Sequence, residues 1–166
     1  MSGKKRRKAS NSFRQAVQNT HELGEDAYCS GLRALTDSDS RRIVSGKVPI
    51  LGSVNLDAAL RLHYPNDARW DYGFGIQKGK PWTLWVEVHP ADTSNVDEVL
   101  KKLTWLKDWL AHSAQPLHNL TPQQSAYHWL ATDGVHINPN SPQARQLAKA
   151  GMTMPRRVLI LDELSL

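Results

Sequence analysis

Residues 68–98 read ARWDYGFGIQKGKPWTLWVEVHPADTSNVDE. On both sides of a Lys-Gly-Lys centre at residues 78–80, large apolar side chains occupy every second position. A period of two is typical of half-buried β-strands, and a glycine in a three-residue loop provides the positive φ that closes a hairpin. The pattern therefore predicts an antiparallel hairpin in which Gln77 pairs with Pro81.

This register brings two acidic residues face to face. Counting outward from the turn places Asp71 opposite Glu87, and facing carboxylates repel each other. A divalent cation would convert this repulsion into binding, because hard cations prefer oxygen ligands. Gly73 and Gly75 leave room beside Asp71, as glycines do where a ligand comes close. The alternative is that Arg69 or a lysine neutralises the pair.

The composition predicts one globular domain with a single core. The chain has 166 residues, of which 40% are hydrophobic and 22% are charged. Its lone cysteine, Cys29, excludes an intrachain disulfide and cysteine-rich zinc sites. No apolar run approaches the ~20 residues that span a bilayer, so we expect no membrane partner. The amino terminus lacks the apolar core of a secretory signal, and we expect a cytoplasmic location.

Positive charge is concentrated near the amino terminus. The formal net charge is +5, and five of the 21 lysines and arginines lie at positions 4–8, so the remaining 16 equal the 16 acidic residues. These five are Lys4, Lys5, Arg6, Arg7 and Lys8. We predict a disordered basic arm over residues 1–11 that contacts nucleic-acid phosphates, followed by a single domain over residues 12–166. The alternative is that the arm is only a solvated chain end.

Helix signals occur in four segments. Capping residues and a face of small side chains predict a helix over residues 12–35, in which Gly24 and Gly31 indicate either tight packing or a break near Gly24. Asn55 caps a second helix over residues 56–62. The clearest helix spans residues 95–112, where a capping-box pattern leads into an apolar stripe. A short helix begins after Ser141 and closes at Gly151.

Three further strands are expected outside the hairpin. Apolar residues predict a short strand at 48–51 and a buried one at 127–131 that ends before Asp133. The aliphatic run at 157–161 is typical of a strand buried on both faces. Together the elements predict an α/β fold with a central mixed sheet of four to five strands flanked by helices.

The order of these elements, together with two short motifs, resembles the PD-(D/E)XK nuclease superfamily, which has the restriction-endonuclease-like fold. Its members share an αβββαβ core and a site made of an Asp followed by Glu-x-Lys on the neighbouring strand. Here WDYGFGI (70–76) resembles the Asp strand, and WVEVHPA (85–91) resembles the Glu-x-Lys strand with His89 in place of the lysine. The similarity covers roughly residues 55–131.

The resemblance implies a metal site for phosphodiester hydrolysis. Asp71 and Glu87 would bind Mg²⁺ or Mn²⁺ with help from the carbonyl of Val88. The metal would orient a water for in-line attack on a phosphodiester and stabilise charge on the leaving oxygen.

The histidine departs from the family pattern. A largely neutral imidazole at His89 can accept a proton or bind metal, but it replaces a fixed ammonium poorly. Some members of the superfamily supply the lysine from elsewhere, and in this chain Lys101 or Lys102 would supply it. The resemblance also implies an acid from the first helix, which is either Glu22 or Glu25.

Three functions follow from these observations. The first is a metal-dependent nuclease that hydrolyses phosphodiesters in DNA or RNA. The second is a catalytically inactive nuclease-like domain that acts as a nucleic-acid-binding or protein-interaction module, for which the His89 exchange and the basic arm argue. The third is an assembly domain in which an exposed strip of Trp105 and Trp109 seals a homodimer. Packing of both tryptophans in a second layer is the alternative to that strip.

Overall fold

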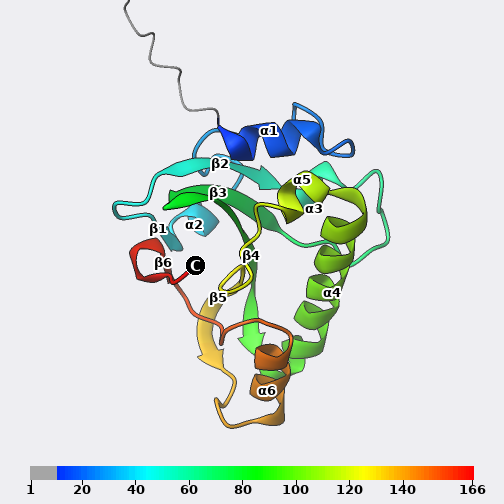
Figure 1. Ribbon diagram of the computed structural model, residues 1–166. Coiled ribbons are helices and arrows are strands. Elements are labelled where there is room, and N and C mark those ends of the chain that lie inside the picture. The colour runs from blue at the N-terminus through cyan, green and yellow to red at the C-terminus, as the bar shows by residue number, and fades with distance from the viewer. Residues whose placement is uncertain (1–10) are drawn as a thin grey trace, which may run out of the picture.

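A four-stranded mixed sheet with the order β2-β3-β4-β5 forms the centre of the molecule (Figure 1). The computed structural model describes residues 11–166. β2 (Ile50–Asn55) is antiparallel to β3 (Tyr72–Lys78), which is antiparallel to β4 (Lys80–Asp92). β5 (Tyr127–His136) lies parallel to β4 and is reached through helix α4 (Val96–Ser113). The predicted α/β class with a mixed sheet is confirmed.

The β3–β4 hairpin has the predicted register. Gln77 pairs with Pro81, and the ladder continues to the pair of Tyr72 and Val86. Gly79 closes the turn with φ of 75°, a conformation in which a Cβ atom is strained. Asp71 is the residue directly before β3, so its backbone continues the strand towards Glu87.

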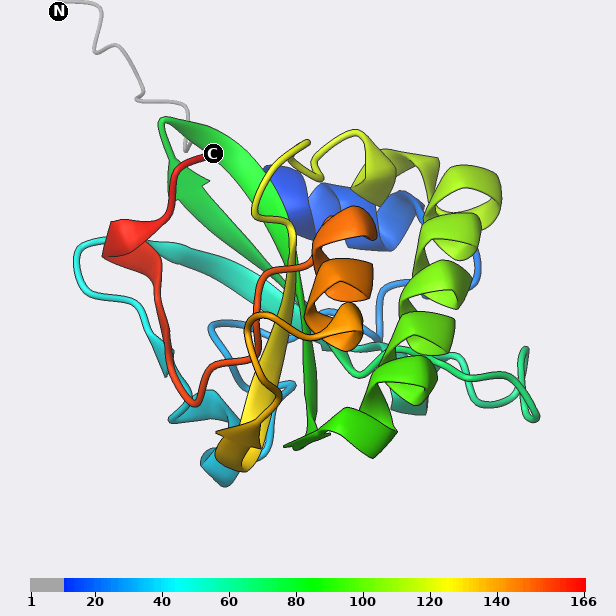
Figure 2. The same cartoon turned by 90° about the horizontal axis from the view of Figure 1, so that it is seen from below.

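Both faces of the sheet are covered (Figure 2). One face carries the helices α1 (Ser12–Asn19), α4, α5 (Gln115–His118) and α6 (Pro142–Lys149). The other face carries a small parallel sheet of β1 (Ile43–Val44) and β6 (Leu159–Ile160), together with α2 (Asp37–Ser40) and the 3₁₀ turn η2 (Leu161–Glu163). The sheet is therefore the middle layer of three, with an apolar cluster on each side.

The prediction of half-buried strands is wrong, because both faces of the sheet are covered. Along β4, Trp85 faces the helices and Val86 faces the small sheet, yet both are fully buried. The space beside Gly73 and Gly75 is also filled, because a Cβ at these positions would lie 2.5 Å from the Trp85 ring and 2.4 Å from the Phe13 ring. The glycines admit core aromatic rings and not a ligand.

The first predicted helix is too long. α1 ends at Asn19, and the chain then turns through Gly24 and Gly31, which have φ of 66° and 54°. α1 ends where Thr20 becomes extended, with φ of −86° and ψ of 107°, and the positive φ of the two glycines then prevents a right-handed helix from resuming. The helix predicted over residues 56–62 is likewise shorter, because α3 spans Leu56–Ala59.

The later helices follow their sequence signals. The short turn η1 (Thr93–Asn95), capped at Asp92, leads into α4. The Ser141 side chain caps α6 by accepting from the Ala144 N–H, and Gly151 follows the helix with φ of 84°. Among the described residues, no helix is both long and apolar enough to cross a membrane.

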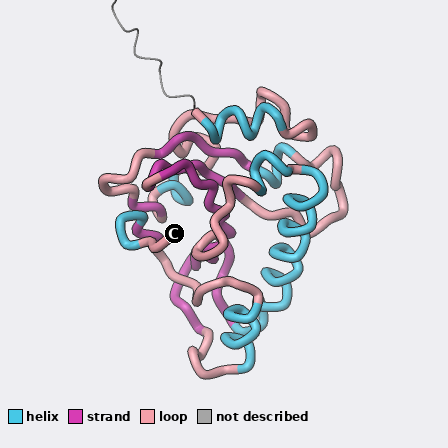
Figure 3. Tube along the Cα trace, viewed as in Figure 1, coloured by secondary structure: helices cyan, strands magenta, loops and turns pink. Residues whose placement is uncertain are grey.

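The carboxyl-terminal strand differs from the prediction. Only Leu159–Ile160 is extended and paired, and it joins β1 instead of the central sheet (Figure 3). Leu159 is buried, whereas Ile160 is 36% exposed. Conversely, β5 runs past Asp133 to His136.

The predicted basic arm lies almost wholly outside the described residues, because residues 1–10 are not described. Asn11 already belongs to the fold. Its side chain accepts from the Arg14 N–H and thereby caps α1, and it donates to the Leu51 carbonyl of β2.

Candidate active site

Asp71 and Glu87 lie together where β3 begins. Asp71 Oδ2 accepts a hydrogen bond from the Val88 N–H at 3.0 Å, and Glu87 Oε2 accepts one from the Asp71 N–H at 3.1 Å. These crossed bonds hold one oxygen of each carboxylate on the neighbouring strand. The other two oxygens, Asp71 Oδ1 and Glu87 Oε1, both face the ammonium group of a single lysine.

That lysine is Lys102 of α4. Its Nζ lies 3.4 Å from Asp71 Oδ1 and donates a hydrogen bond to Glu87 Oε1. The Glu87 side chain has 0% exposure, compared with 16% for Lys102 and 24% for Asp71. The site is therefore closed on the Glu87 side and opens to solvent at Asp71 and Lys102.

Burial dominates the electrostatics of this cluster. Burial raises the pKa of Glu87 well above its ordinary value, and the Asp71 carboxylate raises it further, while the Lys102 ammonium acts in the opposite direction. Burial alone would lower the pKa of Lys102, but Glu87 and Asp71 outweigh it and the pKa is raised. Lys102 stays charged, and two carboxylates share one ammonium.

His89 does not reach this cluster. Its Nδ1 lies 3.1 Å from the Pro90 carbonyl, and its Nε2 lies 3.3 Å from Glu98 Oε2 on the first turn of α4. The ring packs edge-on against Trp129, with 6.2 Å between ring centroids. The position two residues after Glu87 therefore holds a histidine that is turned towards the start of α4.

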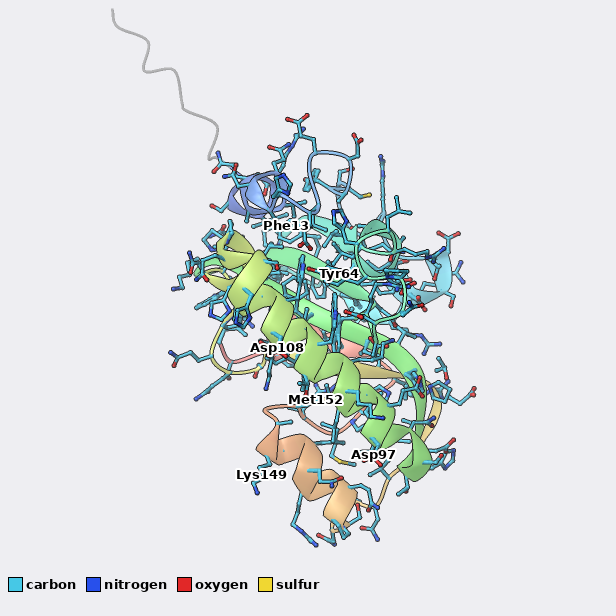
Figure 4. All side chains as sticks on the ribbon, turned by 90° about the vertical axis from the view of Figure 1, so that its right-hand side faces the viewer. Phe13, Tyr64, Asp97, Asp108, Lys149 and Met152 are labelled. Carbon is cyan, nitrogen blue, oxygen red and sulfur yellow. The ribbon has the colours of Figure 1, made fainter. Side chains whose placement is uncertain are left out.

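Lys101 also lies away from the carboxylates. It is exposed and lines a shallow hollow on the outer side of α4 with Asp97, Leu100 and Thr104. Figure 4 shows this side of α4, with Asp97 on its first turn and Asp108 nearer its other end. Of the two lysines named from the sequence, the fold brings Lys102 to Asp71 and Glu87.

The proposed first-helix acid belongs to a different cluster. Glu22 follows α1, and its two oxygens accept from the Tyr64 hydroxyl at 2.8 Å and from Trp109 Nε1 at 3.0 Å. These two bonds give Glu22 a structural role, because they join Tyr64 to Trp109 of α4. Glu25 has no ion pair within the described part of the chain.

The tryptophans on α4 pack within the chain. The rings of Trp105 and Trp109 stack with centroids 6.0 Å apart, and Trp109 is only 4% exposed. Trp105 is partly exposed, and its Nε1 donates to Asp67 Oδ2 at 3.0 Å. Trp109 is therefore unavailable for the exposed strip that a homodimer seal requires, whereas Trp105 retains some exposure.

Arg69 does not neutralise the acidic pair. Its Nη2 lies 3.0 Å from Asp57 Oδ1, and its Nε also donates to Asp57. A lysine does contact both acids, as the alternative drawn from the sequence allowed, because the Lys102 ammonium bridges the two carboxylates. This contact pattern is common to a catalytic lysine and to a purely structural ion triad.

The donors at this site fit a hard divalent cation. With both carboxyl groups ionised, two carboxylates against one ammonium leave a formal charge of −1, and Asp71 Oδ1 and Glu87 Oε1 converge on one cation already. Over residues 11–166, no group of three or more His, Cys, Asp or Glu side chains is close enough to hold a metal. Water and backbone carbonyls would have to complete the shell, as is usual for Mg²⁺.

Sequence reasoning did not identify the contacts that surround this site. The Tyr72 hydroxyl donates to Asp39 Oδ2 at 2.8 Å and ties α2 to the residue next to Asp71. Trp129 Nε1 donates to the His89 carbonyl at 3.0 Å. Neither contact follows from a local pattern, because the partners are 33 and 40 residues apart.

Comparison with known proteins gave no relatives: no family model, curated protein or solved structure matches this chain.

Proposed function

We propose that this chain is a metal-dependent nuclease that hydrolyses phosphodiesters in DNA or RNA. The observation that carries the proposal is the convergence of Asp71 and Glu87, from neighbouring strands, on the ammonium of Lys102. An Asp, a Glu and a Lys in mutual contact are the residue types of the PD-(D/E)XK site. Here the lysine comes from α4 instead of the Glu-x-Lys strand.

The arrangement of elements supports a restriction-endonuclease-like core. α1 precedes the antiparallel strands β2, β3 and β4, with α2 and β1 inserted before β2 and α3 after it, and α4 then crosses to β5, which is parallel to β4. This order matches the αβββαβ core of the superfamily. Asp71 directly precedes the second of the three strands and Glu87 lies on the third, an order that resembles the family pattern.

Each residue of the cluster has a defined role in this proposal. Asp71 and Glu87 would hold Mg²⁺ or Mn²⁺, which when bound supplies a Lewis acid for the attacking water and the leaving oxygen. The backbone N–H groups of Asp71 and Val88 orient the carboxylates. Lys102 Nζ keeps its proton beside both acids and offsets the negative charge of an incoming phosphodiester.

Cleavage assays on plasmid DNA and on structured RNA, with Mg²⁺ or Mn²⁺, test the proposal. We expect Asp71→Asn, Glu87→Gln and Lys102→Met each to reduce the rate by at least about 100-fold, the scale of losing one preorganised charged group. Lys101→Met is the matched control, because Lys101 is the neighbouring lysine and faces away. His89→Gln is expected to retain activity, since its ring is turned towards Glu98.

One observation favours a second function. Glu87 is fully covered, and the Lys102 ammonium already satisfies the oxygens that a metal would use. The same cluster would then be a structural ion triad in an inactive nuclease-like domain that binds nucleic acid or a protein. The assays separate the two functions, because this domain binds nucleic acid or protein but cuts no substrate with either metal.

A further inference from the structure

A basic groove lies on the face of the sheet opposite α4. It is a hollow of about 480 Å³ lined by Ser38, Arg41, Arg42, Arg157 and Val158. The first three lie on or just after α2, and the last two lie directly before β6. The three arginines of this lining therefore come from two segments more than 100 residues apart.

The charges in this arginine groove are not neutralised within the fold. Within residues 11–166, no carboxylate forms an ion pair with Arg41, Arg42 or Arg157 within 4.0 Å. Two acids, Asp37 and Asp39, lie on α2 beside these arginines, and the Asp39 side chain accepts from the Tyr72 hydroxyl. Arg41 and Arg157 are exposed, so their guanidinium groups are free for a ligand.

Arg42 is the fixed member of the groove. Its Nη1 donates to the Ala131 carbonyl at 2.7 Å and its Nη2 to the Thr132 carbonyl at 3.3 Å. Its Nε is buried without a hydrogen-bond partner in the described residues. Two carbonyls hold the guanidinium in place but leave its charge uncompensated, which is the condition for attracting an anion.

The groove is connected to the candidate active site by two contacts. Ala131, which binds Arg42, pairs in the sheet with His89, two residues after Glu87. Asp39, which follows the lining residue Ser38, accepts from the hydroxyl of Tyr72, the residue after Asp71. In Figure 2, α2 lies beside the end of β5, which runs next to β4. The groove and the acidic pair thus belong to the same part of the sheet, on opposite faces.

We propose that the arginine groove binds the sugar–phosphate backbone of the nucleic-acid substrate beside the phosphodiester that is cut. Guanidinium groups bind phosphate oxygens with two parallel hydrogen bonds, and several unpaired ones along a groove suit a chain of phosphates better than a single anion. Because Arg42 binds β5 at Ala131, which pairs with His89 of β4, a backbone bound in the groove continues around the end of the sheet towards the open side of Asp71. This inference rests on the proposed nuclease function for the position of the cut.

Binding of fluorescein-labelled DNA and RNA oligonucleotides in EDTA, measured by anisotropy on the full chain, tests the groove without cleavage. We expect Arg41→Glu/Arg157→Glu to weaken binding by at least about tenfold and to lower the slope of log K against log salt by about 2, one for each lost phosphate contact. Arg33→Glu/Arg145→Glu is the control. Both of its arginines are exposed, and it changes the net charge equally.

The outcomes are distinct. Equal weakening by both double variants overturns the groove, because net charge then explains the effect, and so does absence of binding by the unmodified chain. If the charge reversal lowers the melting temperature, Arg41→Gln/Arg157→Gln tests the same contacts. Cleavage that survives in the groove variant with unchanged binding overturns the groove and leaves the nuclease standing. Groove-dependent binding without cleavage by any metal leaves the groove standing and overturns the nuclease.

Discussion

Glu87 is a carboxyl group with no exposed surface in the middle of a sheet buried on both faces. A buried carboxylate is tolerated only where hydrogen bonds and a counter-ion compensate for the loss of its hydration. Glu87 has both, since it accepts from the Asp71 N–H and from Lys102. The stability of the site at the scale of residues therefore depends on Lys102.

We expect Lys102→Met to destabilise the protein by about 3 kcal/mol near pH 7, because it leaves two close carboxylates without a counter-ion. Lys101→Met, one residue away but exposed, is expected to change the free energy of unfolding by no more than about 0.5 kcal/mol. Urea unfolding of both variants measures the difference. Equal stability of the two would mean that the ammonium does not compensate Glu87.

The loss in Lys102→Met is expected to shrink as the pH falls. The folded-state pKa of Glu87 is already raised, and removing the ammonium that lowers it raises it further. A carboxyl whose pKa is raised by folding stabilises the fold most below its unfolded value of about 4.5 and loses that contribution as the pH rises. Lys102→Met therefore recovers stability between about pH 7 and pH 5.

Adding Glu87→Gln to Lys102→Met provides the control for this pH dependence. The double variant has no buried carboxyl at position 87, so the extra recovery at low pH should vanish. It is also expected to be more stable than Lys102→Met alone near pH 7, because the unpaired charge is gone. A recovery that persists in the double variant would assign the pH dependence to another group.

At the scale of elements, β5 contains a second buried ionisable group. His128 is 1% exposed, its Nε2 donates to the Ser125 carbonyl at 2.6 Å, and its Nδ1 has no partner in the described residues. Burial lowers the pKa of His128 to about 4, although the Ser125 carbonyl acts in the opposite direction. The strand therefore folds around a neutral imidazole.

Acid is expected to destabilise the fold through this histidine. Because its folded-state pKa is below the unfolded value of about 6.5, its contribution is complete above that value and is lost as the pH falls towards about 4. Between about pH 7 and pH 5 the loss is about 2 kcal/mol. We expect His128→Gln to lack this part of the pH dependence, as measured by urea unfolding at several pH values. His136→Gln, at an exposed position, should keep it.

The elements that local signals describe completely were predictable. The hairpin, α4 and α6 carry their turn glycine, caps and apolar periodicity within about 20 residues of sequence. The length of α1 was predictable only in part: the glycines left open a break near Gly24, but no local signal marked Thr20, whose extended backbone ends the helix at Asn19. The burial of β4 on both faces was not predicted either, because it depends on which distant segments of the chain cover the sheet.

The part of the candidate site that depends on local signals was also predictable. The hairpin register alone placed Asp71 opposite Glu87. The choice between Lys101 and Lys102 had a signal that went unused: Lys102 lies three residues after Val99 and four before Leu106, both buried, and so lies beside the apolar stripe. The orientation of His89 was not predictable, because the β4–β5 register shifts between His89 and Ala91 and the ring lies against Glu98 of α4.

At the scale of the whole molecule, three layers determine where a ligand can approach. α4 covers one face of the sheet and places Lys102 over the acidic pair, while α2 and the segment before β6 place arginines on the other face. The sheet itself, buried on both sides, holds these positions relative to one another. A substrate that uses both faces must therefore pass the end of the sheet near Asp71.

Divalent metal is expected to stabilise the whole fold if the acidic pair binds it. A ligand that binds only the folded state contributes about 2.7 kcal/mol at a hundredfold excess over its dissociation constant. For a chain of this size, that corresponds to an increase in melting temperature of roughly 5–10 °C. Thermal unfolding with increasing Mn²⁺ measures the shift, which Glu87→Gln should abolish and Lys101→Met should keep.

Lys102→Met distinguishes two arrangements of the site. If its ammonium occupies the position of the metal, the variant binds Mn²⁺ more tightly than the unmodified chain and shows the larger shift. If lysine and metal lie side by side, the shift is unchanged and only cleavage is lost. If Mn²⁺ does not change the melting temperature of the unmodified chain, the metal site is contradicted. Lys102 is then the permanent counter-ion of Asp71 and Glu87.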